Sequence, residues 1–160
     1  MTLKVHLGAM IAAIFIASAA IAPSASAAPD DACSLLTPAQ LSAALSVSVG
    51  AGSYLSATTK KTCSWKGTAD AGKGSKIVTL MLQTPTAFEY GKSFQSKAIV
   101  VTPVSGVGDD AYYLAVSNNV GLIVKKGNIS FKVAVYASDL TIEQKQAVEK
   151  TLAQQVVSKL

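Results

Sequence analysis

The chain has 160 residues, of which 50% are hydrophobic and 14% are charged, and its formal net charge is +5. These values fit one ordinary globular domain and exclude a collagen, a coiled coil, a disordered tail and a multi-span membrane protein. With two cysteines, one histidine and no arginine, the chain also has few of the side chains that most catalytic and metal sites use.

Residues 1–27 have the order of a secretory signal peptide. A basic start at Lys4 is followed by an apolar run from Leu7 to Ala22 and by small residues up to Ala27. We therefore expect cleavage near Ala27 and a secreted or periplasmic protein without a membrane span. An uncleaved anchor would need about 20 apolar residues, more than this run provides. Lipidation of Cys33 is a third possibility, but the acidic residues before it do not fit that signal.

Residues 28–160 form the expected single secreted domain, which contains no histidine and no arginine. Without histidine there is no Ser-His-Asp or Cys-His catalytic set and no His-ligated metal, so we expect no catalytic residues, no metal and no cofactor. Without arginine there is no bidentate clamp on phosphate or guanine, so specific nucleic-acid binding is not expected. The lysines are dispersed along the chain, which is typical of a solvated surface, and the alternative is an anion-binding or membrane-surface face.

Cys33 and Cys63 are the only cysteines. An oxidising compartment favours one disulfide between them. Closing a loop of about 30 residues should stabilise the fold by about 3–4 kcal/mol. A redox-active or nucleophilic cysteine is the alternative, but the pair is not spaced as Cys-x-x-Cys and has no histidine base.

Three capping boxes predict three helices. Thr37 and Gln40 open a helix from Pro38 to about Leu45, and the proline at its first position favours that start. The same device predicts a second helix from Thr86 to about Lys97 and a third from Thr141 to the C-terminus. The third helix carries an apolar stripe of five residues: Ile142, Val148, Leu152, Val156 and Leu160.

Between the helices, apolar residues alternate with polar ones, which predicts strands with one buried face. Lys126-Gly127-Asn128 separates two such runs and predicts a β-hairpin. The predicted strands are Ser53–Ala57, Thr62–Lys66, Lys76–Thr84, Ala111–Val116, Val120–Lys125 and Ile129–Tyr136. This order predicts an α+β fold, an antiparallel sheet packed against about three helices, built from two halves that each hold a helix and a three-strand meander.

Four aromatic residues are candidates for a binding surface. Trp65 lies beside Cys63 and either packs on the disulfide in the core or is an exposed binding residue. Tyr112 and Tyr113 are adjacent in a strand, so they point to opposite faces and one of them should reach the surface. Together with Tyr136, a surface tyrosine would form a recognition patch.

An enzymatic role would require carboxylates from distant segments. Asp109, Asp110 and Glu89 are the candidates, with a lysine as a further acid or base. Adjacent residues in a strand point to opposite faces, so Asp109 and Asp110 do not form a ready pair, and an aspartate beside a glycine more often caps a turn. A hydrolase would need two carboxyls about 5–9 Å apart, and no spacing in the sequence predicts that.

Three short segments carry a resemblance to a known family. They are Asp31-Ala32-Cys33-Ser34-Leu35-Leu36-Thr37-Pro38-Ala39-Gln40, Cys63-Ser64-Trp65 and Gly106-Val107-Gly108-Asp109-Asp110-Ala111-Tyr112. In this order they resemble a family of small exported bacterial envelope proteins and lipoproteins of unknown function. The resemblance covers nearly all of residues 33–160. It implies a disulfide between Cys33 and Cys63 and an α+β sandwich like the PsbP-type fold, and it implies no activity.

The expected function is therefore that of an exported, non-enzymatic binding or interaction module. Its partner would be an envelope protein, a cell-wall component or a small ligand. The alternative is a hydrolase that acts on an extracytoplasmic substrate through carboxylate acid and base residues.

Overall fold

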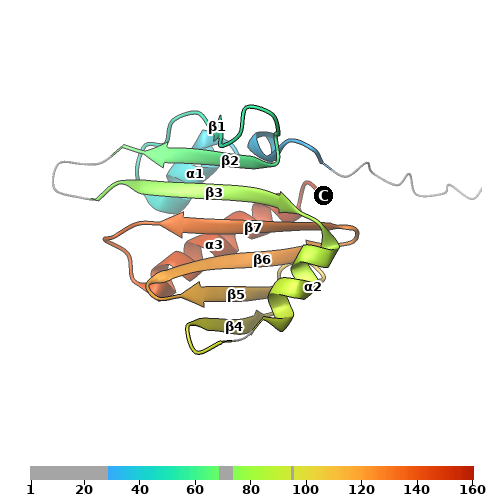
Figure 1. Cartoon of the computed structure of the whole chain (residues 1–160). Helices are drawn as coiled ribbons and strands as arrows, with labels where there is room; N and C mark the ends of the chain where they lie inside the picture. Colours follow the sequence, from blue (N-terminus) through green and yellow to red (C-terminus); the bar gives the residue numbers. More distant parts are fainter. Residues whose placement is uncertain (1–28, 69–73, 95) are drawn as a thin grey trace, which may run out of the picture.

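A seven-stranded antiparallel sheet forms the centre of the computed structural model, which describes residues 29–68, 74–94 and 96–160 (Figure 1). The spatial order of the strands is β1-β2-β3-β7-β6-β5-β4. Their bounds are β1 Ser53–Tyr54, β2 Thr62–Gly67, β3 Lys76–Gln83, β4 Ile99–Val104, β5 Asp110–Val116, β6 Asn119–Lys126 and β7 Ile129–Tyr136. The expected signal segment, residues 1–27, lies outside the described residues. No helix in the described ranges is long and apolar enough to cross a membrane.

The sheet consists of two meanders that meet along β3 and β7. The first meander is β1 to β3 and the second is β4 to β7. They join through antiparallel pairing of β3 with β7, in which Leu80 lies opposite Val133. Helix α1 (Pro38–Leu45) precedes the first meander, helix α2 (Pro85–Ser93) precedes the second, and helix α3 (Ile142–Val157) ends the domain. The predicted α+β fold is thus confirmed, but the second meander has four strands and not three.

Capping boxes start α1 and α3 where the sequence predicts them. The backbone N–H of Thr37 donates to Gln40 Oε1 at 2.9 Å, and the Thr37 hydroxyl accepts from the Gln40 backbone N–H. At α3 the backbone N–H of Thr141 donates to Gln144 Oε1, also at 2.9 Å. Each box satisfies backbone N–H groups that have no partner within the helix.

The predicted bounds of α2 are wrong at both ends. Its N-cap is Thr84 and not Thr86, because Pro85 occupies the first helical position and the Thr84 hydroxyl accepts the N–H three residues later. The helix ends at Ser93 instead of Lys97, because Phe94 adopts an extended backbone.

Strand β4 is missing from the sequence-based prediction. It lies at the edge of the sheet and pairs only with β5. Its residues are half-buried or exposed on both faces, so the strand lacks the alternation of a half-buried strand. Pro103 is tolerated there because an edge strand has one side without a hydrogen-bonding partner.

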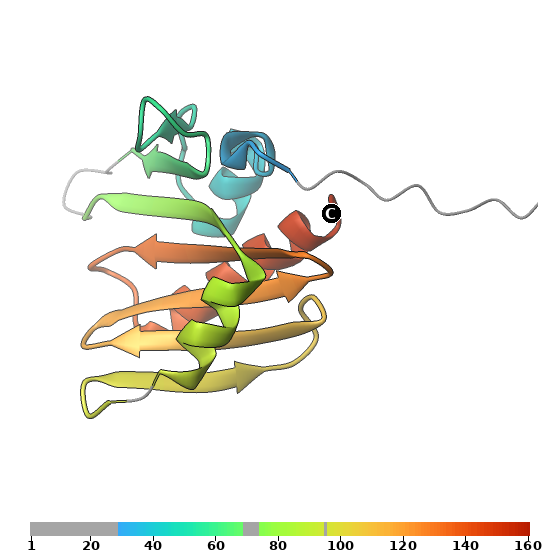
Figure 2. The same cartoon turned by 45° about the vertical axis from the view of Figure 1, so that its right-hand side comes forward.

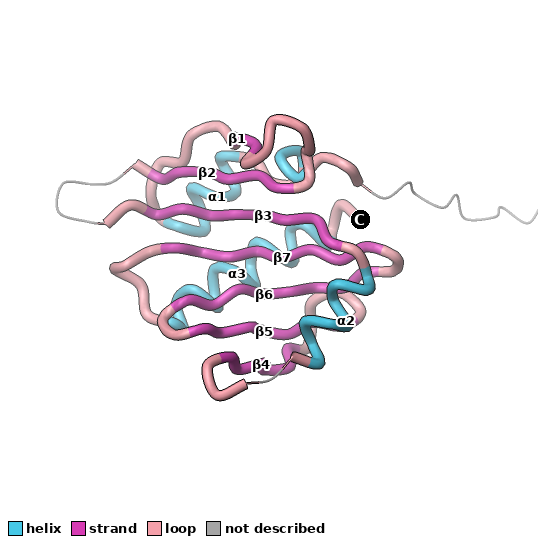
Figure 3. Tube along the Cα trace, in the orientation of Figure 1, coloured by secondary structure: helices cyan, strands magenta, loops and turns pink. Residues whose placement is uncertain are grey.

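The helices cover the two faces of the sheet unequally. Helices α1 and α3 lie behind the sheet in Figures 1 and 3 and enclose the main core. Alternate residues of the central strands fill that core: Val78, Leu80, Leu82, Phe131, Val133 and Val135. The short α2 crosses the opposite face, where Phe88 packs on Tyr112 and Ile123 (Figure 2). We call the uncovered part of this second face the open face.

Candidate binding site

The disulfide between Cys33 and Cys63 is present, with the two Cα atoms 5.0 Å apart. It ties the 3-10 turn Ala32–Ser34 to β2. Cys63 is fully buried in the main core. The bond therefore holds the N-terminal turn onto the edge half of the sheet.

Trp65 belongs to the core and is only 1% exposed, so its proposed place on a binding surface is wrong. It lies on the same face of β2 as Cys63, two residues away. A Cβ added at Gly52 would lie 2.5 Å from Trp65 Nε1 and 2.6 Å from Cys63 Sγ, so both side chains pack against the same glycine. Of the two alternatives for Trp65, the structure shows packing beside the disulfide.

Tyr112 and Tyr113 point to opposite faces as predicted, but both anchor helices. Tyr112 is 1% exposed, its ring lies 5.1 Å from that of Phe88, and its hydroxyl donates to the Phe88 carbonyl at 3.0 Å. The Tyr113 hydroxyl donates to the Gln146 carbonyl of α3 at 2.7 Å. Burial raises the pKa of each tyrosine to about 12. Neither side chain supplies the expected surface aromatic, and only Tyr136, at 40% exposure, does so.

The three carboxylates considered for catalysis each pair with a lysine. Glu89 accepts from Lys125 at 2.7 Å, Asp109 accepts from Lys126 at 2.9 Å, and Asp110 pairs with Lys92. Lys92 and Lys125 also lie 5.9 and 5.7 Å from the centre of the Phe88 ring. The pairs of Glu89 and Asp110 fasten α2 to β6 and β5, whereas that of Asp109 joins the start of β5 to β6.

Asp109 caps a turn, as its position beside a glycine predicts. The backbone N–H of Gly127 donates to its carboxylate at 2.7 Å. This bond and the Lys126 ammonium hold the pKa of Asp109 below its ordinary value. A general acid needs the opposite shift, so the environment of Asp109 suits a structural role.

The open face is built from alternate residues of β2, β3 and β7, which the strand registers arrange in three rows. The rows are Thr62–Met81–Lys132, Ser64–Thr79–Ala134 and Lys66–Ile77–Tyr136. Side chains in the middle row are small, whereas the outer rows carry long ones. Of the middle row, Thr79 lines a hollow on this face.

Two hollows share Tyr136, one on the open face and one at the adjoining end of the sheet. The first, of about 190 Å³, is lined by Leu55, Thr62, Thr79, Met81, Lys132 and Tyr136. The second, of about 450 Å³, lies where β7 ends and β6 begins and is lined by Ser75, Ile77, Asn118, Asn119, Tyr136, Ala137, Ser138 and Lys145. Alternation along β7 predicts an outward-facing Lys132 as well as Tyr136, so the sequence carried a signal for both residues.

Lys132 packs over a glycine of the neighbouring strand. A Cβ added at Gly121 of β6 would lie 2.5 Å from Lys132 Cε and 3.4 Å from Ala134 Cβ. A larger residue at position 121 would displace the end of the lysine side chain from this arrangement. Lys132 also lines the first hollow.

Beneath the open face, the buried Glu149 of α3 accepts a backbone hydrogen bond from β7 in place of a neighbouring strand. The β6–β7 register ends at Leu122 and Val133, and the backbone N–H of Val135 donates instead to Glu149 Oε1 of α3 at 2.9 Å. Glu149 is fully buried, and its Oε2 makes no hydrogen bond within the described residues. The neighbouring Lys145 is 2% exposed and donates to the Asn118 carbonyl at 3.1 Å.

Burial raises the pKa of Glu149 to about 8, although the Val135 N–H and the charges of Lys132 and Lys145 act in the opposite direction. Glu149 is therefore protonated at neutral pH. No motif in the sequence points to this residue. Its signal was positional, because Glu149 lies three residues before Leu152 and seven before Val156, on the apolar side of α3.

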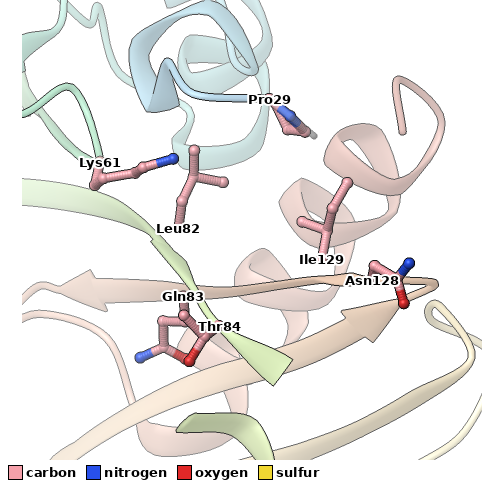
Figure 4. A pocket seen from close by; sticks show the side chains of 7 residues that line it. All are labelled: Pro29, Lys61, Leu82, Gln83, Thr84, Asn128 and Ile129. Carbon is pink, nitrogen blue, oxygen red and sulfur yellow. The ribbon is translucent and has the colours of Figure 1, made fainter. Parts of the chain in front are cut away.

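A third cavity, of about 220 Å³, lies at the end of β3. Its lining residues are Pro29, Lys61, Leu82, Gln83, Thr84, Asn128 and Ile129 (Figure 4). The Gln83 side chain points away from Leu82 and Ile129, and Thr84 already caps α2. This cavity brings together fewer accessible polar groups than the open face does.

Within residues 29–68, 74–94 and 96–160, no group of three or more His, Cys, Asp or Glu side chains could hold a metal ion. The chain matches no protein-family model, no curated protein and no solved structure.

Proposed function

We propose that this chain is an exported envelope protein that binds a ligand without catalysis, and that its site is the open face. The observation that carries this proposal is the pair of hollows that meet at Tyr136, the exposed aromatic residue on this face. Tyrosine combines an apolar ring with a polar hydroxyl and is enriched at binding sites. The disulfide supports an extracytoplasmic location, because such bonds persist in oxidising compartments.

The ion pairs favour binding over the hydrolase alternative. A hydrolase would need one carboxyl with a raised pKa and a second one about 5–9 Å away in a cleft. Glu89, Asp109 and Asp110 are instead each paired with a lysine, and the pairs of Glu89 and Asp110 fasten α2 to the sheet. Glu149 does have a raised pKa, but it is fully buried and therefore has no access to a substrate.

The test uses dodecyl maltoside, a non-ionic amphiphile, below its critical micelle concentration. Backbone amide signals of the disulfide-bonded protein are followed by NMR during the titration. We expect saturable shifts that centre on Thr79, Ala134 and Tyr136 and spare α1 and the outer side of α3. The variant Tyr136→Ala should lose most of the affinity.

Tyr90→Ala is the matched control, because Tyr90 is 69% exposed on α2 and lies outside both hollows. It should bind the probe as the wild type does. If no amide shift saturates, or if the shifts centre on another part of the surface, the open face is not the binding site.

A further inference from the structure

We propose that the open face binds a single-chain amphiphilic anion, with its head group at Lys132 and its apolar chain lying across Tyr136 into the second hollow. This inference deepens the binding function proposed above and rests on it. It names the chemical class of the ligand from the charge, polarity and shape of the site.

The charge of the open face points to an anion. Its three rows contain two lysines, Lys66 and Lys132, and no acidic residue. Lys132 forms no ion pair with any residue that the structure describes. The hollow that Lys132 lines is also bordered by the apolar side chains of Leu55 and Met81, and beside apolar groups a charged partner contributes more than it does in open water.

Glu149, which lies beneath the sheet, does not neutralise the charge of Lys132 at neutral pH. Glu149 is the acidic group whose pKa responds to Lys132, and burial keeps it protonated at neutral pH. The other charged or titratable groups that face Glu149 are Lys145 of α3 and Tyr113 of β5. At neutral pH neither of them supplies a negative charge, so none of these groups competes with an incoming anion for Lys132 in the part of the chain that the structure describes.

The apolar lining and the shape of the hollows point to a narrow, elongated ligand. Leu55 and Met81 border the first hollow, Ile77 and Ala137 border the second, and Tyr136 lies between them. The first hollow, at about 190 Å³, is smaller than the roughly 300 Å³ that a drug-sized ligand occupies. A ligand that fills both must therefore pass Tyr136 as a slender chain.

Exposure assigns the head group to Lys132 and not to Lys145. The end of the Lys132 side chain lies over Gly121, where β6 has no side chain to crowd it. Lys145 is 2% exposed and already donates to the Asn118 carbonyl. Lys66 is exposed on the same face but lines neither hollow, so the half-buried Lys132 is the accessible lysine at the first hollow.

The test compares three probes with the same twelve-carbon chain: dodecanoate, dodecyl maltoside and dodecyltrimethylammonium. Each is titrated at pH 7 below its critical micelle concentration, with the amide shifts of the open face as readout. We expect dodecanoate to bind at least about tenfold more tightly than the neutral probe, and the cationic probe to bind most weakly.

Lys132→Met removes the charge and keeps the apolar stem, so it should bring the affinity for dodecanoate close to that for dodecyl maltoside. Lys150→Met is the matched control, because it changes the net charge equally on α3, behind the sheet. Lys66→Met tests the other lysine of the open face. Both of these variants should retain the preference for dodecanoate.

The outcomes separate this inference from the function on which it rests. If dodecanoate and dodecyl maltoside bind equally well, the face binds ligands but the assignment to an anion is wrong. If Lys150→Met weakens dodecanoate as much as Lys132→Met does, the effect is one of net charge and the inference fails. If neither probe binds, the proposed binding function itself fails.

The proposal commits to a free amphiphile and not to a membrane surface. Sedimentation with phosphatidylglycerol vesicles distinguishes the two sources of an anionic head group. We expect the protein to remain in the supernatant. Vesicle binding that depends on Lys132, without binding of monomeric dodecanoate, would overturn the assignment.

Discussion

Replacing Glu149 by glutamine should abolish a large part of the pH dependence of stability. The pKa of Glu149 is about 8 in the folded protein and about 4.5 when the chain is unfolded. Between these values the folded state holds a proton that the unfolded state has lost, so raising the pH favours unfolding. The free energy of unfolding should fall by roughly 1.4 kcal/mol for each pH unit in this window and level off above pH 8.

Glutamine keeps the hydrogen bond from the Val135 N–H but does not titrate. It also places an amide N–H₂ at the position of Oε2, which has no partner in the described structure, at a cost of about 1–3 kcal/mol. This cost does not vary with pH, so the difference between variant and wild type isolates the titration. From pH 5 to pH 8 the difference should move by about 4 kcal/mol in favour of the variant.

The assay is urea denaturation at pH 5, 6, 7 and 8, followed by the fluorescence of the buried Trp65. Glu143→Gln is the matched control on the same helix. The pKa of Glu143 is lowered, chiefly by a hydrogen bond from its own backbone N–H and then by one with Thr141, so its titration affects stability only at more acidic pH. A difference between Glu149→Gln and the wild type that stays constant from pH 5 to pH 8 would refute the raised pKa.

Three further outcomes are expected. Replacing Cys33 and Cys63 by serine should lower the free energy of unfolding by about 3–4 kcal/mol, measured by urea denaturation, and a reductant should then have no further effect. Gly108→Ala should lower the free energy of unfolding by at least about 2 kcal/mol, because the residue has a positive φ and the new Cβ meets backbone atoms of β6. Gly106→Ala, with a positive φ but open space, should lower it by only about 1 kcal/mol. Equal losses would contradict the steric argument. The affinity for dodecanoate should fall roughly threefold between pH 7 and pH 9 in the wild type, as a negative charge forms beneath Lys132, and remain constant in Glu149→Gln. A parallel decrease in both proteins would exclude Glu149 as the cause.

Local sequence signals predicted those elements whose position depends only on residues adjacent in the chain. The capping boxes at Thr37 and Thr141 placed α1 and α3, and Gly127, with φ of 55°, closed the predicted hairpin between β6 and β7. For α2 two threonines were available, and the proline directly after Thr84 decided between them. Strand β4 lacked a local signal, because an edge strand does not need a buried side.

The site was less predictable because it depends on where α2 docks. Alternation placed Tyr112 on one face and Tyr113 on the other, but only the tertiary packing shows that helices cover both. The same docking left Tyr136 exposed. The burial of Glu149 could not be predicted in the same way. A charged residue on the apolar face of a helix is identified as a buried acid only when the position of that helix on the sheet is known.

The length of α2 explains why a site exists on this face at all. Nine helical residues extend about 13 Å, whereas seven strands about 4.8 Å apart make a sheet about 29 Å wide. One short helix therefore cannot cover the face that it crosses. Threonine, serine and lysine occupy much of the uncovered part, which reduces the cost of contact with water. Ile77 and Met81 remain half-buried beside the hollows, and their exposed apolar surface is what a ligand would remove from water.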